Sequence, residues 1–203
     1  MIINQSIFCQ DFPCQDTDKQ GYHVPSVEID PASITILLIS EASPLDPADH
    51  YYARPEALFA RTTLLAFQDA GAGVAVMDDV LKMGVYATTA VKCAKTGYGI
   101  NLATIQTCSH LLEKEIAQFP NLRVFLLMGD VAIRALNLIA RRSGEPRVIP
   151  AGSTYKIRGG QFFFRHARAL PSYVQAGPAF FVEKSKRRMI AEDIRTALQI
   201  AAG

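Results

Sequence analysis

The strongest constraint on the fold of this chain is the alternation of short apolar runs with longer amphipathic segments. Residues 35–40 form a continuous aliphatic run, which is typical of a strand that is buried on both faces. Residues 85–91, 123–128 and 161–164 have a similar character, and helical spacing of apolar residues occupies much of the remaining chain. Strands separated by helices predict an α/β fold, with three layers (α/β/α) around a central, mostly parallel four-stranded sheet.

The predicted helices cover residues 58–71, 76–83, 101–118, 131–141 and 183–200. A short strand or hairpin is expected over residues 148–158, and a loop rich in Pro and Gly over residues 171–178. Ligands bind at the carboxyl ends of the strands in parallel sheets. The chemistry is therefore expected in the loops that follow Ser40, Lys92, Met128 and Arg168.

Length and composition place the chain among globular proteins of one domain. It has 203 residues, of which 49% are apolar and 20% are charged. No apolar run reaches the roughly 20 residues that span a bilayer, and the N-terminus shows neither the basic region nor the cleavage site of a signal peptide. We therefore expect a cytoplasmic monomer without membrane contact, with residues 1–203 as one domain.

The charges are distributed unevenly along the chain. Residues 1–50 hold one basic residue and eight acidic ones, whereas residues 146–188 hold nine basic residues and one acid. Such asymmetry fits a face that binds an anion, for which nucleic acid is the usual large example. It equally fits a solvated basic surface.

The cysteines either are four unrelated thiols or form one site. Cys9 and Cys14 lie in a polar, irregular segment that has no core to enter, whereas Cys93 follows a predicted strand and Cys108 lies in the next helix. Disulfides are not expected without a secretion signal. Four thiolates can hold a tetrahedral Zn²⁺ or a [4Fe–4S] cluster. The sequence thus predicts a metal or cluster site on these cysteines.

Several motifs occur in an order that points to a known family. They are Cys-x₄-Cys at 9–14, Ile-Leu-Leu-Ile-Ser-Glu-Ala at 36–42, Val-Lys-Cys at 91–93 followed by Cys108, Leu-Met-Gly-Asp-Val-Ala at 127–132, and Pro-Ser-Tyr at 171–173. Over almost the whole chain, this order resembles the iron–sulfur uracil-DNA glycosylases, the family 4 type of their superfamily.

The resemblance implies a cofactor, a reaction and a partner. The cofactor is a [4Fe–4S] cluster on Cys9, Cys14, Cys93 and Cys108, with zinc as the alternative, and residues 1–30 form the cluster-binding N-terminal segment. The reaction is hydrolysis of the N-glycosidic bond of uracil, or of another deaminated base, during base excision repair. The partner is DNA that contains a damaged base, bound in a groove at the carboxyl ends of the strands.

The residues that match the family's catalytic positions are partly altered. The resemblance assigns Glu41 and Ser172 to catalysis, with Glu41 orienting the attacking water. The family's Gly-Glu-x-Pro-Gly loop reads Ser-Glu-Ala-Ser-Pro here, and the resemblance places Ala42 of this loop at the substrate. Thr89 stands where the family reads uracil with Asn, and a hydroxyl satisfies one base edge at most. We therefore expect altered or reduced activity on uracil.

The family's His-Pro-Ser motif reads Leu170-Pro171-Ser172, so its donor to the departing base is missing. One such donor is typically worth about 10²–10³ in rate. His166 lies nearby in sequence as a candidate substitute, although a lone His near a strand end more often has a structural role. Phe59 or Tyr52 is the candidate aromatic partner of the base, and a core position is the favoured alternative for Phe59. The expected DNA contacts are Ser172, Tyr173, Lys184, Lys186, Arg187 and Arg188.

Three functions remain open on the sequence alone. The chain is a DNA glycosylase with altered base preference, a non-catalytic DNA-binding member of the same superfamily, or a zinc-stapled α/β module that binds another ligand.

Overall fold

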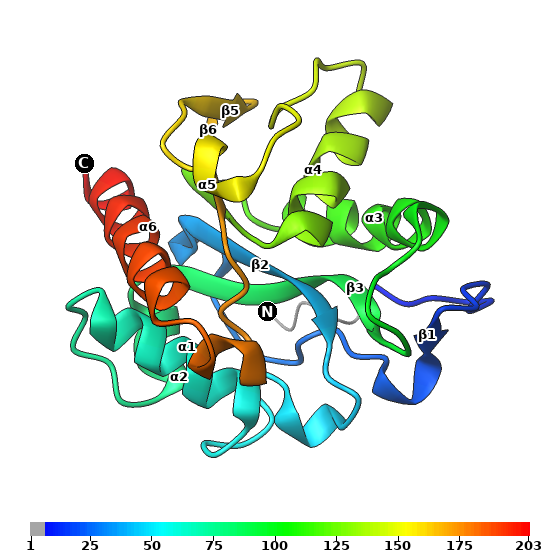
Figure 1. Cartoon of the computed structure of the whole chain (residues 1–203), viewed down its shortest axis with the longest axis horizontal. Helices are drawn as coiled ribbons and strands as arrows, with labels where there is room; N and C mark the ends of the chain where they lie inside the picture. The colour runs from blue at the N-terminus through cyan, green and yellow to red at the C-terminus, as the bar shows by residue number, and fades with distance from the viewer. Residues whose placement is uncertain (1–6) are drawn as a thin grey trace.

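The computed structural model describes residues 7–203 and confirms the α/β architecture (Figure 1). Residues 1–6, which belong to the expected cluster-binding segment, lie outside the described part. The strands are β1 (Thr17–Asp18), β2 (Ile36–Ser43), β3 (Val85–Lys95), β4 (Val124–Met128), β5 (Phe162–Phe164) and β6 (Ala167–Ser172). The α-helices are α1 (Leu58–Asp69), α2 (Met77–Lys82), α3 (Leu102–Ile116), α4 (Asp130–Arg142), α5 (Thr154–Ile157) and α6 (Lys184–Ala202). Single 3-10 turns occur at η2 (Lys19–Gly21), η3 (Pro31–Ser33), η4 (Pro47–Asp49) and η5 (Pro178–Phe181).

The sheet has six strands in the order β1-β3-β2-β4-β6-β5, not the four that the sequence predicts. The four inner strands are parallel, but only β2, β3 and β4 of them are strands that the sequence predicts. The predicted strand 161–164 is β5, which pairs antiparallel at one edge, as β1 does at the other. These edge strands contain two and three residues. The apolar run 161–164 predicts β5 as a strand, whereas β1 is too short to show an alternating or continuous apolar pattern.

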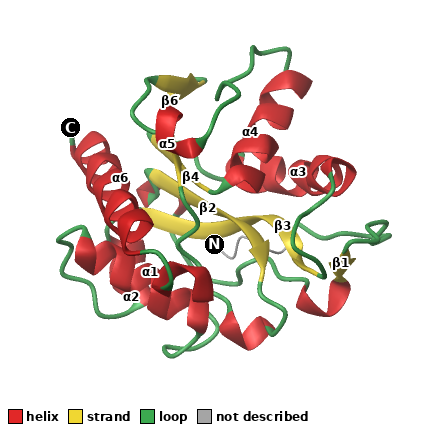
Figure 2. Cartoon of the chain, in the orientation of Figure 1, coloured by secondary structure: helices red, strands yellow, loops and turns green. Residues whose placement is uncertain are grey.

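Helices cover both faces of the sheet, as Figure 2 shows. α3 and α4 pack on one face and α1 and α6 on the other, each over a separate apolar cluster. β2 supplies both clusters, because Leu37 and Ile39 point to one face while Ile36 and Leu38 point to the other. All four side chains are at most 1% exposed. The apolar run of β2 is therefore continuous because the strand is buried on both faces, as the sequence analysis predicts.

Three elements differ from the sequence prediction. α5 occupies part of the stretch 148–158, where a strand or hairpin was expected. β3 continues to Lys95, so Cys93 lies inside the strand rather than after it. β6 was not predicted, and its last two residues fall in the loop that was expected over residues 171–178. β5 pairs only with Ala167–Ala169, so Pro171 lies where β6 has one neighbour, and strands tolerate proline at such places.

α6 is the longest described helix and carries one apolar face. Ile190, Ile194 and Ala197 are buried at helical spacing against the sheet, while charged residues fill the rest of its surface. Within residues 7–203, no helix combines the length and the apolar character needed to cross a membrane.

Candidate functional site

A cavity of about 680 Å³ opens where β2 and β3 end. This is the edge of the sheet where the sequence analysis expects the chemistry. The walls come from the last residues of β2, the start of α1, the end of β3 and the loop after β6. They include Ser40, Glu41, Ala42, Ser43, Phe59, Lys95, Val174, Ala176 and Gly177.

Glu41 lies at the centre of this edge and is partly exposed. Its Oε2 atom lies 4.0 Å from Lys95 Nζ, and 23% of its side chain is accessible. Glu41 also lines a second cavity of about 240 Å³ beside Ser172, Tyr173, Lys186 and Arg187. The carboxylate therefore faces two adjoining hollows, one of which has basic residues in its wall.

Gly129 lies at the turn from β4 into α4. Because it has no side chain, the Glu41 carboxylate can occupy the space beside it. Its φ is 108°, and an added Cβ would lie 2.6 Å from both Glu41 Oε1 and Val174 Cγ2. We expect Gly129→Ala to displace Glu41 and to lower the free energy of unfolding by about 1–3 kcal/mol, measured by urea denaturation. Gly144→Ala is the matched control, because Gly144 has φ 75° and nothing within 4 Å of the added Cβ. Equal losses in both variants would contradict the proposed clash.

A buried polar network forms the floor beneath this cavity, and sequence reasoning missed it. Ser40 Oγ donates to Gln175 Oε1 at 3.1 Å and shares a short hydrogen bond with the Tyr51 hydroxyl. Gln175 Nε2 donates to Tyr51 at 3.3 Å and to Thr63 at 3.4 Å. The network joins β2, the loop before α1, α1 and the loop after β6. The only sequence signal for it is the presence of polar residues next to the predicted strand ends.

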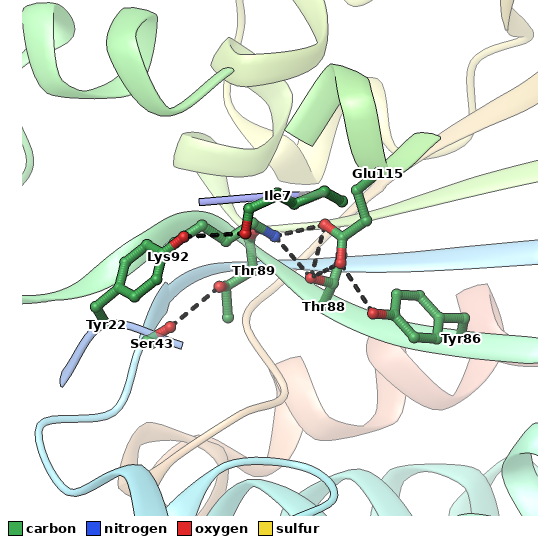
Figure 3. Close-up of polar contacts among 8 residues, drawn as sticks. All are labelled: Ile7, Tyr22, Ser43, Tyr86, Thr88, Thr89, Lys92 and Glu115. Carbon is green, nitrogen blue, oxygen red and sulfur yellow. Dashed lines mark hydrogen bonds and ion pairs between the residues drawn. The ribbon is translucent and has the colours of Figure 1, made fainter. Parts of the chain in front are cut away.

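Thr89 is fully buried behind this edge. Its Oγ1 atom lies 3.3 Å from Ser43 Oγ (Figure 3), and Thr89 pairs with Ser40 in the register of β2 and β3. Ser43 lines the cavity and Thr89 does not. The residue at the base-reading position therefore contacts the cavity only through Ser43.

The other predicted substrate residues divide into two groups. Ala42 and Phe59 line the cavity, each 8% exposed. Tyr52 does not line it, because its hydroxyl accepts from the Ala87 N–H at 2.8 Å and its ring stacks on Tyr86. Of the two aromatic candidates, only Phe59 reaches the cleft.

Leu170 and Pro171 lie inside β6 and are buried. Leu170 is 4% exposed and belongs to the apolar cluster under α1 and α6, so it is a core residue. His166 precedes β6 at the opposite end of the sheet, where it is exposed beside Arg123 and Arg168. Neither residue brings a donor to the cavity.

Ser172 is buried at the wall of the smaller cavity. Its hydroxyl donates to Asp193 Oδ2 at 2.6 Å, and Arg158 donates to the same carboxylate. Burial raises the pKa of Asp193, although both of these hydrogen bonds act against the rise. The Ser172 hydroxyl is thus engaged in holding β6 to α6.

The basic residues at the start of α6 have acidic neighbours. Lys186 Nζ lies 2.6 Å from Glu183 and 5.5 Å from the centre of the Tyr173 ring. Arg187 donates to Asp69. Lys184 and Arg188 are exposed, and Arg188 lies 3.9 Å from Glu192. The first two turns of α6 therefore place four basic side chains near the smaller cavity, three of them with an acidic partner.

His50 is fully buried beneath Phe59, and neither ring nitrogen has a hydrogen-bond partner among the described residues. Its ring centre lies 4.1 Å from that of His23 and 6.2 Å from that of Phe59. Burial lowers the pKa of His50 well below 6.5, and the positive charges of His23 and Lys92 act in the same direction. Burial lowers the pKa of His23 as well. The imidazole of His50 is therefore neutral at neutral pH.

We expect acid to destabilise the protein through His50. The unfolded chain takes up a proton near pH 6.5 that the folded chain binds only at lower pH. The free energy of unfolding then falls as the pH drops below this value, by up to about 1.4 kcal/mol per pH unit. In urea denaturation between pH 5 and 7, His50→Phe should make the free energy of unfolding less dependent on pH, with the contribution of His23 remaining. The control is His110→Gln, which changes an exposed histidine and should leave the pH dependence as it is. An unchanged slope in His50→Phe would contradict the assignment.

The four cysteines, which come from two distant stretches of the chain, line one cavity of about 540 Å³. Cys9 and Cys14 are half-buried in the N-terminal segment. Cys93 in β3 is 7% exposed and Cys108 in α3 is 5% exposed. All four are free thiols.

Three attachments hold the N-terminal segment at this cavity. The Tyr22 hydroxyl accepts from the Cys9 N–H at 3.1 Å and donates to the Ile7 carbonyl at 3.3 Å (Figure 3). Asp16 accepts from the Asn101 N–H at 2.6 Å and from the Thr104 hydroxyl. β1 pairs with the end of β3. The segment is therefore anchored on both sides of its two cysteines.

Burial favours the neutral form of two of these thiols, Cys93 and Cys108. Burial raises the pKa of Cys93 to about 12, and the negative charges of the other three thiolates add to the rise. Burial also raises the pKa of Cys108, while Lys92 acts against the rise. Within residues 7–203, no three Cys, His, Asp or Glu side chains converge closely enough to hold a single metal ion.

The chain is similar to a type-5 uracil-DNA glycosylase of Thermus thermophilus. The two are 27% identical over 126 residues, which cover 61% of this chain and 54% of that protein. This similarity supports membership of the uracil-DNA glycosylase superfamily. No family model matches the chain. The chain spans about half the length of this relative, and the relative is of type 5 where the sequence motifs resemble family 4.

Proposed function

We propose that the chain is a DNA glycosylase that carries a [4Fe–4S] cluster. Its preferred substrate is a deaminated base other than uracil, and its activity on uracil is reduced. The observation that carries the proposal is the convergence of all four cysteines on one cavity, in a fold whose strand ends form a cleft around Glu41. The similarity to a uracil-DNA glycosylase supports the same reaction class.

The residues at the cysteine cavity fit an iron–sulfur cluster. Cys9, Cys14, Cys93 and Cys108 supply the four thiolate ligands that such a cluster takes. A single zinc ion, the alternative, needs all four sulfurs about 2.3 Å from one point, and no three of the described ligand groups converge that closely. When bound, the cluster would act as a structural cross-link between the N-terminal segment, β3 and α3.

The cleft supplies the groups that glycosidic cleavage needs. The flipped nucleotide enters a fitted pocket, and its bond breaks to a cationic sugar and an anionic base. Glu41 provides negative charge for the sugar and an acceptor that orients the attacking water. Phe59 offers an aromatic face to the base in the wall of the same cavity.

Base selection is expected to differ from that of the family. The Thr89 hydroxyl is buried and engaged with Ser43, and Leu170 lies in the core under α6. The two side chains that would replace the family's base-reading Asn and its His donor therefore cannot reach a base in the cavity. The Ser43 hydroxyl and the backbone around Ala42 are left to contact the base, which supports altered or reduced activity.

The basic start of α6 supports DNA as the partner. Lys186 and Arg187 line the smaller cavity beside Glu41, while Lys184 and Arg188 are exposed on the same two turns. Phosphate contacts from such residues position the duplex without reading its sequence. Tyr173 lies in the same wall, beneath Lys186.

The test is release of a base from defined oligonucleotides. The anaerobically purified protein is incubated with single- and double-stranded DNA containing uracil, hypoxanthine or xanthine, and abasic sites are then cleaved with alkali. We expect release of at least one of these bases, with uracil not the best substrate. Binding to the same DNA without release of any base would instead support the non-catalytic alternative, which the burial of Thr89 and Leu170 favours.

A further inference from the structure

A basic pocket of about 450 Å³ opens at the end of the sheet opposite the cleft. It lies where β4 and β6 begin, beside the C-terminal end of α6. The described residues that line it are Arg123, Gln161, Phe163, His166, Arg168 and Ile200, and none of them is acidic. The cleft, the smaller cavity beside Ser172 and the cysteine cavity each have at least one acidic residue in their walls. The basic pocket is therefore the most favourable of these four hollows for an anion.

The register of the strands places three of these residues side by side. Phe163 in β5 pairs directly with Arg168 in β6, and the Arg168 backbone N–H donates to the Arg123 carbonyl at 2.7 Å. The Arg168 guanidinium lies over the Phe163 ring, with its Cζ atom 5.1 Å from the ring centre. The backbone of the sheet thus holds two arginines and one aromatic ring in a single row.

The two arginines have no counter-charge in the described part of the chain. Arg123 Nη1 donates to the Ala201 carbonyl at 2.9 Å. Arg168 Nη2 donates to the Gly160 carbonyl at 3.0 Å. Within residues 7–203, no acidic side chain forms an ion pair with either arginine. Arg168 is half-buried, and a charge that is partly removed from water without compensation is unfavourable, so a bound anion would stabilise this arrangement.

A purely structural role accounts for only part of this pocket. Each guanidinium has five N–H donors, and the described protein accepts from one of them in Arg123 and one in Arg168. The C-terminal end of α6 adds only a partial negative charge beside Arg123. Phe163 is 57% exposed, so its ring is not used to fill the core. Free donors and a free aromatic face in one hollow are better explained by a ligand.

The residue types indicate which ligand fits. Arginine binds phosphate through paired hydrogen bonds, an exposed aromatic ring stacks on a base, and a basic groove with such a ring is typical of single-strand binding. The Gln161 amide can both donate to and accept from a base edge. Inorganic phosphate or an acidic peptide would leave the Phe163 ring unused, and in a duplex the base faces are stacked on one another.

We propose that the basic pocket binds a single-stranded segment of DNA, with Arg123 and Arg168 on a phosphate and Phe163 stacked on a neighbouring base. β6 contains six residues, and a strand rises about 3.3 Å per residue, so roughly 20 Å separate this pocket from the strand ends that form the cleft. The pocket is thus a second DNA contact outside the cleft. The inference requires neither the cluster nor base removal.

The first measurement is the affinity of the full chain for a labelled oligothymidine, by fluorescence anisotropy. Phe163→Ala removes the stacking face and should weaken binding about 10-fold or more. Arg123→Gln should weaken it as well, and should reduce the slope of log K against log salt by about 0.7, the value for one phosphate on a single strand. Arg141→Gln is the matched control, because Arg141 is an exposed arginine on α4, which packs on the other face of the sheet.

Photochemical cross-linking then locates the bound strand. Oligothymidine that carries 4-thiothymidine is irradiated with the wild-type chain, and the modified peptide is identified by mass spectrometry. We expect cross-links within residues 161–168. Cross-links confined to residues 41–59 or 173–188 would place the strand at the cleft and overturn the inference. Base release from a blunt duplex tests the proposed function separately and does not depend on this pocket.

The variants decide between the remaining outcomes. Phe163→Ala and Arg123→Gln change exposed side chains and are expected to fold, which circular dichroism checks. Oligothymidine affinity equal to that of the wild type in both variants would overturn the inference. Binding of polyglutamate that is lost in Arg123→Gln, without binding of oligothymidine, would assign the pocket to an acidic protein partner and overturn it as well.

Discussion

Replacing Glu41 with glutamine is expected to reduce base release by about 10²–10³-fold, the usual effect of removing one electrostatic group from a transition state. Glutamine has nearly the same shape, so the fit against Gly129 and Val174 is kept while the negative charge is lost. The measurement is single-turnover cleavage of the best substrate found among uracil, hypoxanthine and xanthine DNA, together with DNA affinity in the same buffer.

Affinity is the first control on this variant. Removing an acid from a DNA-facing cleft should leave DNA binding unchanged or slightly tighter, so a loss of rate cannot arise from weaker binding. Glu56→Gln is the matched control, because Glu56 precedes α1 outside the cavity and 67% of its side chain is exposed. Retention of activity within threefold of the wild type by Glu41→Gln would remove Glu41 from the mechanism.

Replacing Cys108 with serine is expected to abolish the cluster almost completely. The side chain is 5% exposed in α3 and faces the cavity shared with Cys9, Cys14 and Cys93. Loss of one ligand leaves three thiolates, one of which, Cys93, is buried where its charged form is disfavoured. We expect iron content near zero and faster proteolysis within residues 9–18, because the hydrogen bonds of Tyr22 and Asp16 and the pairing of β1 with β3 then hold this segment without the cluster.

Thr107→Ala is the control for the cysteine variant. Thr107 lines the same cavity from the same helix but supplies no thiolate. Its iron content and its protease resistance should equal those of the wild type. Cluster content that is equal in Cys108→Ser and Thr107→Ala would show that Cys108 is not a ligand.

The parallel core of the fold could be predicted because its strands carry a continuous apolar pattern. β4 and the first four residues of β2 are buried on both faces, so every position there is apolar and the sequence shows the strand directly. β6 carries no such signal, since Arg168 and Pro171 interrupt its apolar residues. α5 was wrongly predicted as a strand or hairpin because so short a helix has no period to detect.

The cysteine cavity could also be expected, because Cys93 and Cys108 lie on a strand and on the helix that follows it. The groups that organise the cleft could not. Gln175 and Ser40 are 135 residues apart, and their hydrogen bond depends on how the loop after β6 lies over the end of β2. The buried ion pair between Lys92 of β3 and Glu115 of α3 (Figure 3) has no sequence signature either, since charged residues are usually exposed.

Three residues that were expected at the substrate do not line the cavity, and the reason is the same for each. Leu170, Thr89 and Tyr52 were assigned to the substrate by position in a motif, but the packing of α6, Ser43 and Tyr86 removes them from the cavity. Motif position determines where a residue lies along a strand, whereas its access to a ligand depends on the side chains that pack over it.

Metal analysis of the wild-type protein, purified without oxygen and without added metal, tests the central claim most directly. Convergence of four thiols on one cavity predicts about four irons and four acid-labile sulfides per chain, a brown colour, and a paramagnetic signal after reduction by dithionite. One zinc per chain in a colourless protein, or four thiols that all react with a thiol reagent in metal-free protein, would contradict the account.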